Sequence, residues 1–360
     1  MNAPAKESQI ENELAEKIRP VFSIYDIQHA QGNIFFFGVP KEEIRIIFEK
    51  LFPFFSEKGY QFTIKYDLGE HILIASPLSP QKERRWINVV LAIATVFTTM
   101  VFGSLMFGAD PGTSPAEVLK GLPFTIAIMT VLGAHEAGHY IVAKKHGMHT
   151  SLPYFIPFPN MIGTMGAVIK HKGPIPNRKA LFDVGVSGPL IGLFVSIIVT
   201  IFGLLQPAIP QASEGLSIEL GIPFLFELIS RFIPNQETMM MHPIAFAGWV
   251  GMFVTALNLI PAGQLDGGHV LRAMIGERAK EVSRMMPFIL ISLGFYVIYY
   301  LEKDGYIWVL WGLFLSFFTA AGHPRPLDDD IPLGKGRMAL GIITFILGLI
   351  CFTLVPFQLQ

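Results

Sequence analysis

A His-Glu-x-x-His motif, formed by His135, Glu136 and His139, lies inside an apolar stretch long enough to be a membrane-spanning helix. On a helix, positions i and i+4 share one face and lie about 6 Å apart along the axis. His135 and His139 can therefore bind one zinc ion through neutral imidazole nitrogens. Glu136 is beside them, where it can take a proton from a metal-bound water.

The surroundings of this motif favour a metal site over a chance match. Three ionisable groups on consecutive turns of an apolar span are costly in a bilayer, and such residues are functional candidates. The alternative is that His135 and His139 are structural histidines that form hydrogen bonds between helices. We favour the metal site because of this location.

A tetrahedral catalytic zinc site uses three protein ligands and leaves the fourth position to water. The segment 258–268 offers a carboxylate, Asp266, just past the end of a later apolar stretch, on the same side of the membrane as His139. Pro261 and the glycines near Asp266 interrupt the helix and free backbone groups that can line a polar cavity. The alternative is that Asp266 caps the following helix. The matching depth of Asp266 and His139 favours the aspartate as the third ligand.

The composition is that of a membrane protein with a soluble part. Of the 360 residues, 51% are hydrophobic and 15% are charged, whereas soluble domains have about 25% charged residues. The formal net charge of −1 gives no support for nucleic-acid binding. The single cysteine excludes an intramolecular disulfide and a cysteine-ligated structural zinc.

Four parts follow one another along the chain. Residues 1–19 are polar with mixed charge, and we expect a flexible N-terminus without a signal peptide. Residues 20–78 contain four β-rich runs and one amphipathic helix, which predicts a small α+β domain. Residues 79–85 are expected to be a linker, and residues 86–360 a polytopic α-helical membrane domain.

Seven apolar segments divide the membrane domain, which predicts about six to seven transmembrane helices. The segments are residues 86–108, 121–143, 181–205, 241–261, 285–301, 306–321 and 338–356. Two of them, 285–301 and 306–321, are short for a span and can form a tight hairpin. Basic residues concentrate on alternate connections, including the one before the first segment. The positive-inside rule therefore places the N-terminal domain in the cytoplasm.

Residues 149–179, between the second and third apolar segments, combine prolines with aromatic side chains. This stretch is too proline-rich for a spanning helix and too apolar for an ordinary loop, which predicts a re-entrant or interfacial β segment. An exposed strand edge near the metal site can hold an extended peptide, so Gly163 and Gly166 are candidate substrate-binding residues. The alternative is a plug-like loop without substrate contact. We expect His149 and His171 to be interfacial residues and not ligands.

These motifs resemble those of the site-2 protease family of intramembrane zinc metalloproteases, peptidase family M50. The resemblance rests on His135-Glu-Ala-Gly-His139 and on Asn258-x-x-Pro261 followed by Asp266-Gly267. It extends, less specifically, through Gly163-Thr-Met-Gly166 and Ser187-Gly-Pro189, and places the zinc protease core at about residues 86–275. The chain departs from the family pattern at Gly263, where the family has a second proline.

The resemblance implies one zinc ion bound by His135, His139 and Asp266, with Glu136 as the general base. It also implies an accessory polar role for Asn258 near the oxyanion. The expected function is hydrolysis of peptide bonds in membrane proteins that have a transmembrane helix. The lipid bilayer is the expected surrounding, and a cell membrane with the site open to the cytoplasm is the simplest localisation.

The competing function is that of a transporter or channel for zinc or another divalent metal. The same three ligands would then form a transit site, and broken helices are common in transporters. Two features count against transport. The apolar segments show no evident inverted repeat, and Glu136 would be superfluous at a transit site.

Overall fold

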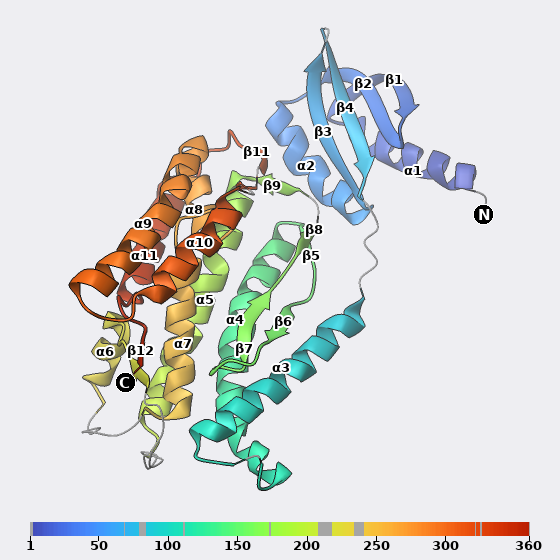
Figure 1. The fold of residues 1–360 in the computed structure, drawn as a ribbon. Coiled ribbons are helices and arrows are strands. Elements are labelled where there is room, and N and C mark those ends of the chain that lie inside the picture. Colours follow the sequence, from blue (N-terminus) through green and yellow to red (C-terminus); the bar gives the residue numbers. More distant parts are fainter. Residues whose placement is uncertain are drawn as a thin grey trace.

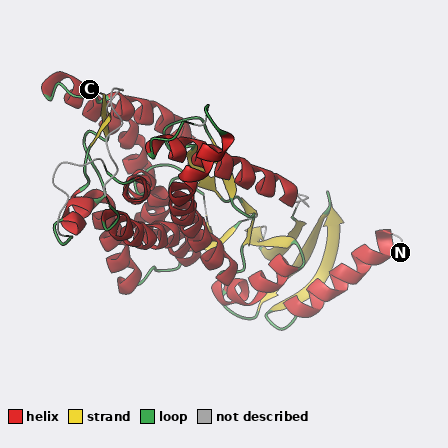
Figure 2. Ribbon diagram, turned by 90° about the horizontal axis from the view of Figure 1, so that it is seen from below, coloured by secondary structure: helices red, strands yellow, loops and turns green. Residues whose placement is uncertain are grey.

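The computed structural model describes residues 3–67, 69–78, 84–110, 112–172, 174–207, 218–233, 241–320, 322–324 and 326–359. An N-terminal domain lies beside one end of a bundle of helices, which we call the membrane domain (Figure 1). Helices make up most of the membrane domain, and the long strands belong to the N-terminal domain (Figure 2).

The N-terminal domain has a four-stranded antiparallel sheet, in the order β1-β2-β4-β3. Its strands are β1 (Phe22–Ala30), β2 (Asn33–Pro40), β3 (Tyr60–Asp67) and β4 (Glu70–Pro77), with α2 (Ile44–Glu57) between β2 and β3. The apolar face of α2 packs on the sheet, where Phe48 and Phe55 contact the ring of Phe62. The predicted combination of four strands and one helix is confirmed.

The expected flexible N-terminus is wrong, because Ala3–Ile18 form a helix, α1. Leu14 and Ile18 are fully buried in the core of the N-terminal domain, and Ile10 packs against that core. These three residues recur at i, i+4 and i+8, which is the spacing of one helix face. The polar composition of the segment concealed this stripe. The expected linker lies mostly outside the described residues, which resume at Arg84.

All seven predicted apolar segments lie on helices. These are α3 (Arg85–Met106), α4 (Leu122–Lys145), α5 (Arg178–Leu204), α7 (Pro243–Asn258), α9 (Ala279–Tyr300), α10 (Tyr306–Ala320) and α11 (Lys335–Ile350). Within the described chain, the stretches 85–106, 115–145, 178–204 and 266–300 are long and apolar enough to cross a membrane, while α7 and α10 are shorter. The chain is therefore a multi-pass membrane protein.

Shorter elements connect these helices. They are β5 (His149–Thr150), β6 (Tyr154–Pro157), β7 (Thr164–Val168), β8 (His171–Lys172), β9 (Ile175–Asn177), α6 (Phe224–Ser230), α8 (Asp266–Ile275) and β11 (Pro326–Asp328). Strands β10 (Ile218–Leu220) and β12 (Phe357–Leu359) pair with each other. The predicted tight hairpin is formed by α9 and α10, which approach so closely that a Cβ at Gly312 would lie 2.8 Å from the carbonyl oxygen of Pro287.

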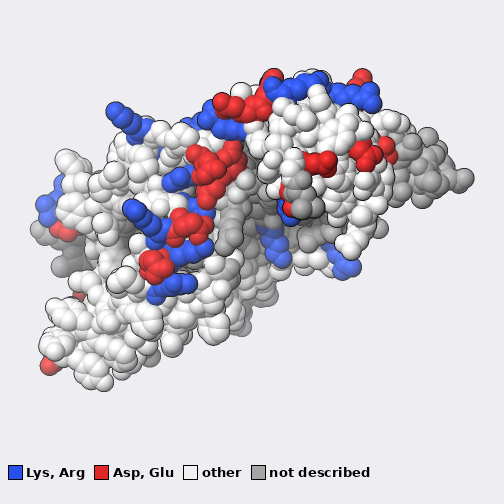
Figure 3. All heavy atoms as spheres, turned by 90° about the horizontal axis from the view of Figure 1, so that it is seen from above, with Lys and Arg blue, Asp and Glu red and all other residues white. Residues whose placement is uncertain are grey.

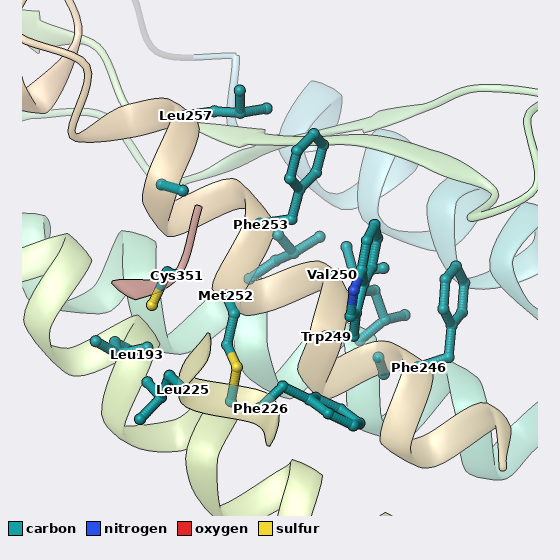
Figure 4. Packing of buried hydrophobic residues seen from close by; sticks show 14 of the residues in the cluster. Leu193, Leu225, Phe226, Phe246, Trp249, Val250, Met252, Phe253, Leu257 and Cys351 are labelled. Carbon is teal, nitrogen blue, oxygen red and sulfur yellow. The ribbon is translucent and has the colours of Figure 1, made fainter. Parts of the chain in front are cut away.

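Helix α7 lies in the core of the bundle and is apolar on every face, as expected for a helix surrounded by protein. The rings of Phe246, Trp249 and Phe253 stack along it, with centroids 5.7 and 5.3 Å apart (Figure 4). Small residues bring α7 close to α5, since a Cβ at Gly248 would lie 2.8 Å from the backbone nitrogen of Thr200. This contact fixes the position of α7 and of the segment that follows it.

A β-hairpin of β6 and β7 lies along α3 (Figure 1). Asn88 Nδ2 donates to the carbonyls of Leu152 and Pro153, at 2.9 and 3.0 Å, and Thr98 Oγ1 donates to the carbonyl of Gly163 at 2.7 Å. The two anchors on α3 are about 15 Å apart along its axis. Backbone outside helices is tolerated at membrane depth where protein satisfies it in this way. The predicted β segment is therefore present, and its re-entry into the membrane stays a prediction.

Candidate metal centre

His135, His139 and Asp266 come together in the membrane domain. Nε2 of His135 lies 3.1 Å from Nε2 of His139, and Oδ2 of Asp266 lies 3.3 Å from each of these nitrogens. Both histidines are 6% exposed. No other group of three or more His, Cys, Asp or Glu side chains converges in this way among the residues that the structure describes. The predicted ligand set is thus brought together.

The dimensions of this triangle suit zinc. Bonds from zinc to nitrogen and oxygen ligands are about 2.0–2.2 Å long, so neighbouring ligand atoms around a tetrahedral ion lie roughly 3.3–3.6 Å apart. The two separations that involve Asp266, both 3.3 Å, are at the short end of that range, and the separation of the two histidine nitrogens, 3.1 Å, is slightly below it. Two imidazoles and one carboxylate leave a fourth position for water, as in catalytic zinc sites.

Helix α5 orients the histidine ligands. Nδ1 of His139 donates to the carbonyl oxygen of Val184 at 2.8 Å, which leaves the Nε2 lone pair directed at the metal position. Gly188 and Gly192 leave room for the two rings. A Cβ at Gly188 would overlap the ring of His139, and one at Gly192 would lie 3.0 Å from Nδ1 of His135. Larger residues at these two positions would displace the ligands.

Asp266 is the first residue of α8, which follows a turn in which Gly263 has a φ of +52°. Leu265 and not Asp266 occupies the position before the helix, so the helix-cap alternative is wrong. Gly267 and Gly268 lie directly on the backbone of residues 259–263, where a Cβ at either position would overlap a carbonyl group. This close approach sets the start of α8, and with it the carboxylate, at the depth of the two histidines.

Glu136 and Asn258 lie beside the triangle of ligand atoms. Glu136 is 5% exposed and lies in the electrostatic field of His139 and Asp266. The backbone of Ile169, just after β7, interacts with its carboxylate, so the hairpin passes next to this side chain. Asn258, the last residue of α7, places Nδ2 3.4 Å from Nε2 of His135.

The two glycines of the hairpin have different surroundings. Gly163 has a φ of +79° and presses on α3, where a Cβ would lie 2.6 Å from Cα of Thr99. Gly166 has a φ of +103°, and a Cβ there would meet no atom within 4 Å among the described residues. Gly163 is therefore a packing residue of the hairpin turn, whereas the backbone at Gly166 is open.

Residues 123–301 match the sequence profile of peptidase family M50. This part of the chain belongs to peptidase family M50. The matched M50 segment contains the three ligand residues, Glu136 and Asn258. Family membership and the converging ligand atoms together support one zinc ion as the cofactor. The metal-transporter alternative gains no support from these comparisons.

Several proteins similar to this chain carry the word chloroplastic in their names. The chain is 28% identical over 292 residues to "Probable zinc metallopeptidase EGY3, chloroplastic" of Arabidopsis thaliana, covering 75% of this chain and 49% of that protein. It is 29% identical over 287 residues to "Probable zinc metalloprotease EGY1, chloroplastic" of Oryza sativa subsp. japonica, covering 74% and 48%. The chain thus spans about half the length of these relatives. The solved site-2 protease of Methanocaldococcus jannaschii aligns at 20% identity, with a TM-score of 0.32, over 62% of this chain and 86% of that chain.

His171 is half-buried, and its Nδ1 has no hydrogen-bond partner in the described part of the chain. That His171 lies at the membrane interface stays a prediction. Burial lowers the pKa of His171, and the ring lies in the field of His139 and Asp266. Its position comes from the pairing of β8 with β5, which opposes His171 to Thr150. No local sequence signal announces such a pairing of short strands.

Two other polar residues also have partners that the sequence did not indicate. His149 donates from Nε2 to the carbonyl of Ser56 in the N-terminal domain, at 2.6 Å. Asp329, in the acidic run 328–330, binds the buried Arg272 of α8. Both contacts join segments that are far apart in the sequence, so the spacing of residues along the chain could not predict them.

Proposed function

We propose that this chain is an intramembrane zinc metalloprotease that hydrolyses peptide bonds of membrane proteins with a transmembrane helix. The observation that carries the proposal is the convergence of His135, His139 and Asp266 beside the buried carboxylate of Glu136. The names of the relatives, zinc metalloproteases and a zinc metallopeptidase, agree with it.

The side chains of the site divide the chemistry among them. A zinc ion held by His135, His139 and Asp266 supplies a Lewis acid that polarises a carbonyl and lowers the pKa of water. Glu136 takes a proton from the attacking water and returns it to the leaving amine. Asn258 Nδ2 donates a hydrogen bond to the carbonyl oxygen of the substrate as that oxygen gains negative charge. Loss of one such donor costs about 10²–10³ in kcat.

Strand β7 offers an edge to which an extended substrate can add. Its strand partner is β6, on the α3 side, while the segment after it reaches Glu136. A helical substrate hides its carbonyls in i to i−4 hydrogen bonds, so it must unwind before it can be cut. Main-chain hydrogen bonds to β7 would hold the unwound segment beside the base. Gly166 keeps this edge unobstructed, and Gly163 sets the turn that holds the hairpin on α3.

The N-terminal domain and the opening of the site are assigned to the cytoplasmic side of a cell membrane. Figure 3 views the molecule from the end at which the N-terminal domain lies in Figure 1, and basic and acidic side chains gather on that face. The positive-inside rule supports this orientation. We also propose how the chain is divided. The N-terminal domain ends at residue 78, and the membrane domain begins at residue 86, has its protease core at about residues 86–275 and crosses the membrane six to seven times. Cell fractionation tests this localisation against that of the relatives, whose names call them chloroplastic.

Cleavage by the purified protein tests the function. The protein in lipid nanodiscs is incubated with a single-span substrate tagged at both ends, with and without a zinc chelator. We expect cleavage within the span, its loss on chelation and its recovery with added zinc. Liposomes loaded with a zinc-sensitive dye test the competing function in parallel. Zinc flux without cleavage of any substrate offered would overturn the protease assignment.

A further inference from the structure

A buried arginine lies on the helix that begins with Asp266. The side chain of Arg272 is 1% exposed. Its Nη1 and Nη2 donate to Oδ1 and Oδ2 of Asp329 at 3.1 and 2.5 Å, and Nη2 also donates to Oε1 of Glu277 at 2.7 Å. The pair with Asp329 is bidentate, the arrangement that gives an arginine–carboxylate contact geometric specificity.

Helix α8 is fixed at both ends. At its start, Gly267 and Gly268 rest on the backbone of residues 259–263. At its end, Arg178 of α5 donates to the carbonyls of Ala273 and Met274, at 2.5 and 3.0 Å. Arg272 is about 9 Å along the axis from Asp266, near this second end. Because α8 is short and rigid, a shift at Arg272 is transmitted to the carboxylate ligand.

Asp329 is in turn connected to the N-terminal domain. It follows β11, which pairs in parallel with β9 at the start of α5. Leu327 of β11 packs against the core of the N-terminal domain, and Asp328 and Ile331 line a cavity of about 390 Å³ together with Phe48 and other residues of α2. The segment that holds Arg272 is therefore seated on the N-terminal domain.

The helix that carries the histidines ends on the same domain. Ser56 Oγ donates to the carbonyl of Gly147, just after α4, at 2.7 Å, and the His149 ring donates to the carbonyl of Ser56. The N-terminal domain thus contacts the chain directly after α4 and, through Leu327, the loop bound to α8. The same domain therefore contacts the end of α4, the helix of the two histidines, and the loop bound to α8, the helix of Asp266.

We infer that Arg272 and Asp329 form a clamp that positions Asp266 relative to His135 and His139, through a loop seated on the N-terminal domain. The inference rests on the proposed zinc site and concerns positioning residues. A buried ion pair is an inefficient device for stability alone, since apolar replacements are often neutral or better. Its two parallel hydrogen bonds suit another role, which is to fix the position of α8 relative to the loop that carries Asp329.

Zinc affinity of the full-length protein tests the clamp independently of cleavage. Affinity is measured by competition with a chelator, and the absorption of the cobalt-substituted protein reports ligand geometry. Asp329→Asn removes one charge from the clamp, and Asp330→Asn removes the same charge from the exposed neighbouring residue. We expect Asp329→Asn to weaken zinc binding about tenfold or more, within the range known for outer-shell partners, and to change the cobalt spectrum. Asp330→Asn should match the wild type.

Two further variants keep the test decisive. Arg272→Met removes the buried charge with a side chain of similar length, so folding should survive even if Asp329→Asn unfolds. It should weaken zinc binding to the same degree, and the double variant of Arg272→Met and Asp329→Asn should bind zinc no more weakly than either single variant.

Leu327→Ala should weaken zinc binding two- to threefold, because Leu327 packs the loop of Asp329 against the N-terminal domain. Wild-type zinc affinity in folded Arg272→Met would overturn the clamp, and wild-type affinity in Leu327→Ala would overturn its link to the domain. A wild-type protein without zinc affinity would contradict the zinc site itself.

Discussion

Oδ2 of Asp266 lies 3.3 Å from Nε2 of His139, although helices α5, α6 and α7 separate these residues along the chain. Nδ1 of the same histidine donates to the carbonyl of Val184, so Nε2 is the nitrogen left to bind a metal, and it faces Asp266. Three helices, α4, α5 and α8, therefore define a single metal position.

Glu136→Gln should retain zinc and lose cleavage. The amide has nearly the same shape as the carboxylate, but it cannot accept a proton from water. Loss of a general base lowers kcat by about 10²–10⁴. Metal analysis and cleavage of the tagged substrate are measured on the same preparation. If the variant cleaves at the wild-type rate, Glu136 is not the base.

Gly188→Ala should weaken zinc binding, because the added Cβ overlaps the ring of His139. We expect a loss of about 10–100-fold in zinc affinity, the range seen when the orientation of a ligand is disturbed. Gly336→Ala is the matched control, since a Cβ at that position meets no described atom within 4 Å. Equal affinity in the two variants would show that α5 does not position His139.

Thr98→Val should loosen the hairpin, because Thr98 Oγ1 is the donor to the carbonyl of Gly163. The bond contributes about 1 kcal/mol. We expect KM for a transmembrane substrate to rise severalfold, with a smaller change in kcat, because β7 is proposed to hold the substrate and not to react with it. Thr125→Val is the control, since among the described residues Thr125 Oγ1 donates to the carbonyl of Gly121, at the start of its own helix. A purely kcat effect would contradict the role of the strand edge.

Leu14→Ala should destabilise the N-terminal domain by about 2–5 kcal/mol, the usual cost of truncating a fully buried leucine. Leu14 is 0% exposed and lies in the core with Ile18 and Phe22. Faster hydrogen exchange of the sheet in the full-length protein is the measurement. Glu16→Ala changes an exposed position of the same helix and should leave exchange unaltered. Unchanged exchange in Leu14→Ala would mean that α1 is not part of the folded domain.

Much of the fold and the core of the site could be predicted from local patterns. Each predicted apolar segment lies on a helix, and the spacing of His135 and His139 indicated two neighbouring candidate ligands because helix geometry fixes where i and i+4 residues lie. Asp266 could be proposed because the topology places it at a matching depth. The contact of Arg272 with Asp329 and the pairing of His171 with Thr150 could not, since they depend on how loops and two-residue strands pack in three dimensions. Helix α1 was missed for another reason: its apolar stripe is narrow and its composition polar.

Zinc X-ray absorption on the purified full-length protein tests the central claim most directly, with metal content measured on the wild type and on Asp266→Ala. We expect one zinc per chain in the wild type, with two imidazoles and oxygen ligands at about 2.0–2.2 Å and no sulfur. Asp266→Ala should lose most of the metal while remaining folded. A folded wild-type protein without zinc, or full zinc occupancy with an unchanged spectrum in Asp266→Ala, would contradict it.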